Sequence, residues 1–182
     1  DLNSGLKWEP DFEISLTNRA RILQSLEKHA EALDDLRRIL IVREETYGKE
    51  HLQVALACKT LAMALQSAGA ELRDIDQAIA LWQRTLEIYE KQLPQAKAMN
   101  GEFSAEVRDI HLKLADAHMT LKNYVEAAKS VEAALTTAER AADENAPALT
   151  RRLRYRFALQ LALAKQYDRA VKQFLLVKEY DQ

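Results

Sequence analysis

The chain has 182 residues, of which 48% are hydrophobic and 30% are charged. This length and composition suit one domain with a sizeable buried core. The formal net charge of -2 argues against nucleic-acid binding through a globally basic surface. No run of about 18 apolar residues occurs, so we expect no membrane-spanning helix. Glycine and proline are scarce, which favours long helices.

Two features of the sequence bear on the cellular location of the protein: the start of the chain and its single cysteine. No signal-peptide pattern opens the sequence. The first residue is Asp1 and not methionine, so a processed chain and an excised fragment both fit. Cys58 is the single cysteine and can form no internal disulfide. We therefore expect a reducing, cytoplasmic setting, with import into an organelle left open.

Taken in chain order, apolar residues spaced three and four apart predict eight helices. Their expected ranges are 14–27, 30–47, 51–67, 75 or 77–92, 104–122, 124–143, 146–165 and 167–180. These pair into hairpins over about 14–48, 51–92, 104–143 and 146–180. We expect residues 1–13 to form an N-terminal extension and residues 14–182 to form one helical repeat domain.

Local signals mark the ends of several helices. Gly48 reads as a helix C-cap that adopts a positive φ. Between Ala70 and Asp76, either the helix begins one turn early or the loop is longer, with Asp74 or Asp76 as the N-cap. Proline at position 10 is expected to interrupt any helix there, while Pro94 marks a break and Pro147 a helix start.

A repeated spacing of alanines organises the whole chain. The pairs are Ala20 and Ala32, Ala62 and Ala78, Ala115 and Ala127, and Ala158 and Ala170. Their separations are 12, 16, 12 and 12 residues, so the second pair carries one additional helical turn. Four residues after each second alanine stands a large apolar residue: Leu36, Trp82, Val131 and Phe174. Such self-similarity predicts stacked hairpins that bury their apolar faces against one another.

These features resemble the tetratricopeptide repeat family, whose second helices often start with the Tyr-x-x-Ala seen at Tyr124 and Tyr167. The long period is similar to that of kinesin light chains, whose hairpins join through Gly-x-x-His-x-x-Val-Ala. Here that joint reads Gly48, His51, Val54 and Ala55, within ILIVREETYGKEHLQVALACKTLA. The resemblance covers roughly residues 14–180. It implies an all-α, right-handed α-solenoid of about four stacked antiparallel hairpins.

Catalytic and metal-binding signatures are missing from the sequence. The four glycines are too scattered to form a phosphate-binding loop. His111 and His118 lie seven residues apart on one helix face without a His-Glu-x-x-His pattern, so we interpret them as packing residues. Cys58 has no base near it in the sequence and reads as a small buried hydrophobe. We therefore expect no enzyme activity, no metal site and no cofactor.

The candidate site follows from the resemblance, which implies that the first helix of each hairpin lines a concave groove. The proposed lining residues are Lys59, Met63, Lys113, Arg152, Tyr155 and Arg156. Three of them stand at basic positions of the carboxylate clamp of tetratricopeptide co-chaperones, while Met63 and Lys113 replace its asparagines. Local positive charge attracts an acidic peptide even to a negative protein. Arg156 is the first candidate, because a guanidinium binds carboxylates bidentately. Ordinary surface ion pairing is the alternative.

The expected function is a non-enzymatic protein–protein interaction module, an adaptor or scaffold that binds an acidic peptide or helix with an aromatic anchor. The alternative is a structural solenoid segment of a multi-protein complex that contacts partners through its ends and convex face. A regulatory domain that senses a peptide is a third class. Leu6 and Trp8 are expected to cover the first hairpin. Alternatively, with Glu9 and Asp11 beside them, they enter the groove, because this segment resembles the tryptophan-acidic cargo peptides that kinesin light chain repeats bind.

Overall fold

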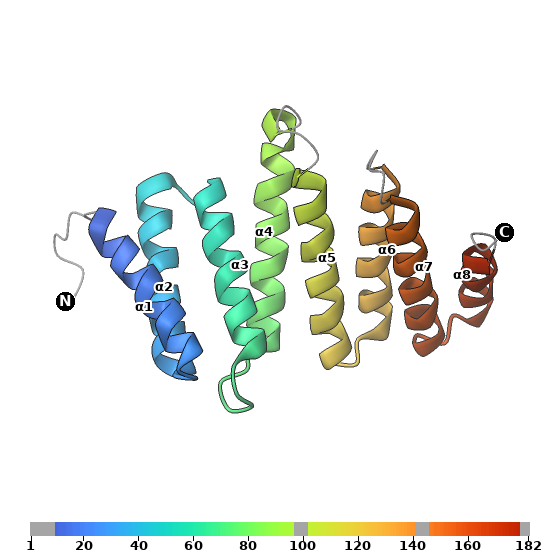
Figure 1. Cartoon of the computed structure of the whole chain (residues 1–182), viewed down its shortest axis with the longest axis horizontal. Helices are drawn as coiled ribbons and strands as arrows, with labels where there is room; N and C mark the ends of the chain where they lie inside the picture. Colours follow the sequence, from blue (N-terminus) through green and yellow to red (C-terminus); the bar gives the residue numbers. More distant parts are fainter. Residues whose placement is uncertain (1–9, 97–101, 141–145, 179–182) are drawn as a thin grey trace. The chain divides into compact units, whose positions relative to one another are not determined.

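The computed structural model describes residues 10–96, 102–140 and 146–178 (Figure 1). Side chains are described over 12–91, 105–140 and 147–177. These residues form eight α-helices and contain no β-strand. The chain divides into two compact units, 1–91 and 92–182, and each is described by itself. The alternatives for Leu6 and Trp8 concern residues outside the described part.

The first unit is built from α1 (Pro10–Ser25), α2 (His29–Tyr47), α3 (Leu52–Ser67) and α4 (Ile75–Ala96), the last of which runs past the unit's boundary. Helix α2 packs against both α1 and α3. Two hydrogen bonds join α4 to α3: the indole of Trp82 donates to Gln66 Oε1 over 3.0 Å, and the Thr85 hydroxyl donates to the Ala55 carbonyl over 3.4 Å. The hairpins of this unit therefore stack on each other.

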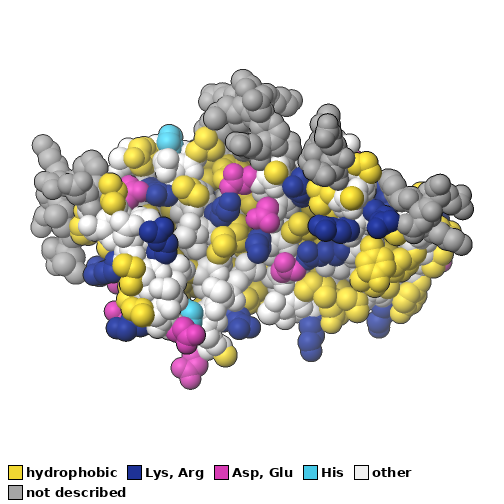
Figure 2. All heavy atoms as spheres, in the orientation of Figure 1, with side chains coloured by type: hydrophobic (Ala, Val, Ile, Leu, Met, Phe, Trp, Pro, Cys, Tyr) yellow, Lys and Arg dark blue, Asp and Glu magenta, His cyan; other side chains and the backbone are white. Residues whose placement is uncertain are grey.

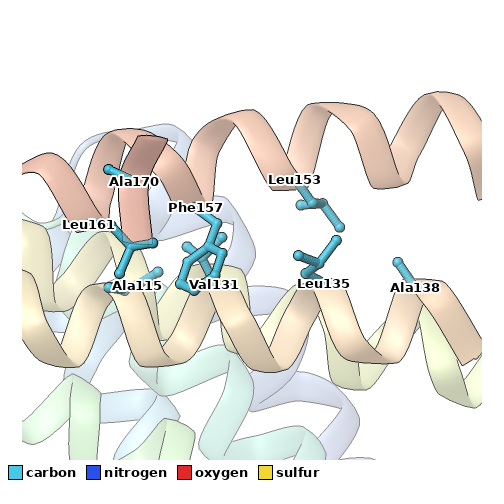
Figure 3. Close-up of a cluster of buried hydrophobic side chains, with 9 residues drawn as sticks. Ala115, Val131, Leu135, Ala138, Leu153, Phe157, Leu161 and Ala170 are labelled. Carbon is cyan, nitrogen blue, oxygen red and sulfur yellow. The ribbon is translucent and has the colours of Figure 1, made fainter. Parts of the chain in front are cut away.

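The second unit contains α5 (Glu102–Thr120), α6 (Tyr124–Arg140), α7 (Ala146–Leu163) and α8 (Tyr167–Lys178). Each of these helices packs against the next one along the chain. Their shared core includes Val131, Leu135, Phe157 and Leu161, all buried (Figure 3). The predicted all-α fold of stacked antiparallel hairpins is confirmed.

The alanines of the repeated pairs are buried within the hairpins. All eight of these alanines are at most 3% exposed. A methyl side chain lets two helices approach more closely than a larger one, so a small residue on each helix sets the distance within the hairpin. Leu36, Trp82 and Val131, one turn further on, are also buried. Phe174 is only partly buried.

Three of the four hairpins turn through the same backbone geometry. Glu27, Lys122 and Lys165 adopt the left-handed conformation, with φ of 59°, 59° and 60°. In the turn at Lys122, the Asn123 N–H donates to the His118 carbonyl and the Lys122 N–H donates to the Met119 carbonyl. This pair of bonds is a Schellman motif and recurs in the other two turns. Equal alanine spacing thus corresponds to equal turns.

The second hairpin has a longer turn. Helix α3 ends at Ser67 and α4 begins at Ile75, so the additional residues lengthen the loop and do not start the helix early (Figure 1). Asp74 is the N-cap, because its Oδ1 accepts the Gln77 N–H over 2.8 Å. The longer-loop alternative with Asp74 as the cap is therefore the one that the structure adopts.

Gly48 and His51 have separate roles in the joint between α2 and α3. Gly48 has a φ of 85°, as predicted, and its N–H donates to the Glu44 carbonyl. Nδ1 of His51 caps α3 by accepting the Gln53 N–H over 3.2 Å, and its ring stacks on Tyr47 at 4.9 Å between centroids. A glycine and a histidine at this spacing thus end one helix and begin the next.

Two helices extend beyond their expected ends. Helix α1 begins at Pro10 and not near residue 14, because proline is tolerated in a first turn, where its missing N–H has no helical partner. The expectation that Pro10 interrupts a helix is wrong. Helix α4 continues to Ala96, with Pro94 in its last turn, although we expected it to end near Gln92.

Candidate functional site

The six candidate residues lie on first helices of hairpins. Helix α3 of the first unit carries Lys59 and Met63. In the second unit, α5 carries Lys113, and α7 carries Arg152, Tyr155 and Arg156. The candidates therefore form two groups, one on α3 in the first unit and one on α5 and α7 in the second unit.

On α3, Lys59 lies between two exposed apolar side chains. Leu56 precedes it by three residues and Met63 follows it by four, so the three share one helix face. Both apolar residues are exposed, while Lys59 is half-buried. The sequence reasoning missed Leu56, although its position one turn before Lys59 could have identified it.

On α7, Arg156 already holds a carboxylate. Its guanidinium lies 2.5 Å from Oδ1 of Asp116 on α5, the neighbouring first helix of the same unit. The Asp116 side chain is exposed, and Arg156 is partly exposed. Arg156 therefore reaches a side chain of α5 and is engaged in an ion pair.

Tyr155 lies on a longer exposed stripe of α7. Arg152 precedes it by three residues, and Leu159 and Leu163 follow it at intervals of four, and all four side chains are exposed. The ring of Tyr155 contacts that of Phe174 on α8 edge-on, with centroids 5.7 Å apart. The sequence reasoning missed the two leucines, which the spacing of four residues could have revealed.

Cys58 and His118 are shielded from solvent to different degrees. Cys58 is fully buried, and this burial raises the pKa of its thiol to about 11. Burial lowers the pKa of His118, partly offset by the nearby Glu126, and its buried Nδ1 has no hydrogen-bond partner. Within the described ranges, no three His, Cys, Asp or Glu side chains are grouped to bind a metal ion. None of the helices in these ranges is long and apolar enough to cross a membrane.

Three surface pockets lie away from the six candidates. Two are formed where a hairpin turn approaches the next one, at 27–31 with 69–72 and at 122–126 with 163–165. The third is polar and lies at the α2–α3 joint. Two of its three basic side chains are partnered, since Arg84 pairs with Glu44 at 2.5 Å and Lys91 pairs with Glu50, and three glutamates line it as well. It therefore offers little excess charge for an anion.

Comparisons with known proteins agree with the fold. Residues 11–91 match the model of the tetratricopeptide repeat family. The crystal structure of BtubC (BKLC) from P. vanneervenii is 19% identical, with a TM-score of 0.71 over 98% of this chain and 66% of that one. The nearly identical TPR-like repeats of a Podosopora anserina putative kinesin light chain are 20% identical, with a TM-score of 0.65 over 93% and 74% of the two chains.

The apo form of RapI is 17% identical, with a TM-score of 0.55 over 97% of this chain and 58% of that one. This chain thus spans less than two thirds of the length of BtubC and of RapI. A comparison with curated proteins gives no match. At these identities, the structural likeness shows the fold alone. The tetratricopeptide repeat is therefore assigned to residues 11–91, and over most of its length the chain shares the fold of these kinesin light chain repeats.

Proposed function

We propose that this chain is a non-enzymatic binding module that holds an acidic peptide or helix of another protein against the first helices of its hairpins. The tetratricopeptide fold points to a protein-interaction or scaffold role. Beyond this role, we propose that the six candidate residues line a groove and that the ligand bound there is acidic. We also take residues 14–182 as one domain in the cytoplasm, acting as an adaptor within a multi-protein complex.

The observation that supports the acidic ligand best is the ion pair between Arg156 and Asp116. A guanidinium that holds the carboxylate of a neighbouring helix has the position and donors to hold a ligand carboxylate instead. Exchange costs little, because exposed ion pairs contribute only about 0–1 kcal/mol to stability. A ligand carboxylate would therefore displace Asp116 and leave that side chain hydrated.

The neighbouring side chains suit the rest of such a ligand. Arg152 is exposed one turn before Tyr155, and Lys113 lies three residues before Asp116 on α5. Tyr155 offers a half-exposed ring on which an aromatic or apolar residue of the ligand could pack. In the first unit, the flexible thioether of Met63 beside Lys59 provides a similar combination of apolar surface and positive charge.

Triple charge reversal tests this proposal. Lys113→Glu, Arg152→Glu and Arg156→Glu are combined, and binding of a synthetic peptide with acidic residues around one tryptophan is measured by fluorescence anisotropy. The affinity should fall at least about tenfold, which corresponds to about 1.4 kcal/mol. Lys129→Glu is the matched control, because this exposed lysine lies on α6, a second helix.

Partner capture from a lysate of the source organism extends the same comparison. If specific partners are lost with the triple variant but kept with the control, their shared acidic segments define the ligand. If peptide affinity and captured partners are both unchanged, the groove proposal is wrong. A fluorescently tagged chain found outside the cytoplasm would overturn the proposed location separately.

A further inference from the structure

The ion pair between Arg156 and Asp116 is held by one hydrogen bond. Nη2 of Arg156 donates to Oδ1 of Asp116 over 2.5 Å, and these two described side chains share no second bond. The pair of Arg19 with Asp35 in the first unit differs, because Nε and Nη2 of the arginine donate to both oxygens of a buried carboxylate, over 2.7 and 2.5 Å. The fold fixes such a buried, two-bond pair, whereas a one-bond pair at the surface opens readily.

The pair of Arg156 with Asp116 is open to solvent and lies on two first helices. The side chain of Asp116 is 56% exposed and that of Arg156 is 32% exposed. Other ion pairs between the two hairpins of this unit reach α6, a second helix: Arg154 with Glu139, and Arg169 with Glu132. In the region of α5 and α7, Figure 2 shows basic and acidic side chains close together. A carboxylate of the chain itself therefore occupies a guanidinium of the proposed groove.

Asp116 differs from the residues at the same position of the other hairpins. It follows Ala115, and the residues that follow the equivalent alanines are Arg21, Met63 and Leu159. Met63 and Leu159 are exposed apolar side chains, and Met63 is itself one of the six candidates. The acid at this position repels the carboxylates of an acidic ligand and at the same time engages the arginine that would bind one of them.

We infer that Asp116 is an autoinhibitory residue that determines the specificity of the groove: it holds Arg156 in the free chain, and a ligand carboxylate has to displace it. The inference rests on the proposed function, since it concerns the same groove and the same acidic peptide. Exchange of one carboxylate for another leaves the number of charge-assisted bonds unchanged, so a weakly acidic segment gains little and is rejected. A ligand gains most when its carboxylate engages two nitrogens of Arg156, as Asp35 does with Arg19.

Asp116→Asn tests the inference, because it removes the charge and keeps the size of the side chain. Fluorescence anisotropy measures how the full chain binds a synthetic peptide with acidic residues around one tryptophan, and a second peptide in which glutamine replaces each acid. The variant should bind the acidic peptide about two- to fivefold more tightly, the factor that an exposed ion pair allows. Its affinity for the glutamine peptide should stay unchanged, and far-UV circular dichroism checks that the fold persists.

Two further variants separate the release of Arg156 from a general change of charge. Glu132→Gln is the matched control, because it removes the same charge and breaks a comparably exposed ion pair with Arg169, but on α6 and α8. It should leave the affinity for the acidic peptide unchanged. In an Arg156→Gln background, Asp116→Asn should bring no gain, because the partner that it releases is already gone.

The outcomes distinguish this inference from the proposed function. If the triple charge reversal weakens the acidic peptide but Asp116→Asn does not tighten it, the inference is wrong and the groove proposal stands. An equal gain in the Arg156→Gln background would also overturn the inference, since the gain would then come from charge alone. If the triple reversal has no effect, or if no variant binds the peptide, the groove proposal itself fails and the role of Asp116 fails with it.

Discussion

Replacing Lys122 by glycine should stabilise the second unit. Lys122 holds a left-handed φ of 59° in the turn between α5 and α6. This conformation costs a residue with a Cβ about 1–2 kcal/mol, and glycine avoids that cost. Glycine also makes the unfolded chain more flexible, which cancels about 0.5–1 kcal/mol. The net gain in the free energy of unfolding should be about 0.5–1 kcal/mol, provided that the Schellman bonds remain.

Urea denaturation followed by circular dichroism measures this gain, and thermal unfolding should show a rise in Tm of roughly 2–8 °C for a unit of this size. Lys122→Ala removes the same charge but keeps the Cβ, so it should not stabilise the unit. Lys129→Gly, at an exposed position inside α6, should destabilise it by about 1 kcal/mol. Equal stabilisation by Lys122→Ala and Lys122→Gly would refute the backbone explanation.

Three further predictions concern buried polar groups. Arg19→Ala should lower the urea midpoint of the first unit, because the buried Asp35 carboxylate would lose two charge-assisted hydrogen bonds of 2.7 and 2.5 Å. The double variant Arg19→Met with Asp35→Leu should recover part of this loss, because it leaves no buried charge without a partner. An unchanged midpoint in Arg19→Ala would contradict the prediction. Because the folded-state pKa of His118 lies below its ordinary 6.5, the unfolded chain binds the proton more readily. Stability should therefore fall as the pH drops below about 6.5, and His118→Gln should flatten that slope in urea titrations. Burial raises the pKa of the Cys58 thiol to about 11, so at pH 8 its thiolate is roughly a hundredfold scarcer than it would be with a pKa of 9.0. Iodoacetamide should therefore label Cys58 only after unfolding. Rapid labelling of the folded chain would refute the burial of Cys58.

The hairpin pattern could be read from the sequence because its causes are local. Alanine spacing fixes which helix faces meet, and the single 16-residue spacing located the atypical turn at 68–74. Whether those additional residues extend a helix or a loop was not predictable, since AELRDID suits both. The hydrogen bond from the Gln77 N–H to Asp74 Oδ1 decides it, because it marks Asp74 as the residue after which the helix begins.

The candidate site was less accessible to sequence reasoning. Lys113, Arg152 and Arg156 could be placed on first helices, but nothing in their local sequence indicates that Arg156 pairs with Asp116, which lies 40 residues away on another helix. A long-range ion pair depends on how two helices pack. Because surface side chains leave that packing almost unaffected, their sequence does not indicate which of them will meet. The six candidates therefore remain a proposal about binding.

The sequence by itself determined the helices, their pairing and the apolar face of each one, because helical periodicity and the spacing of small residues are local properties of the sequence. Only the tertiary structure decided which apolar faces are covered. Ala128 and Val171 each follow the second alanine of a pair, yet Ala128 is buried in the core that α6 shares with α7 and Val171 is exposed. Periodicity shows that a face is apolar, but burial depends on the neighbour that arrives there from elsewhere in space.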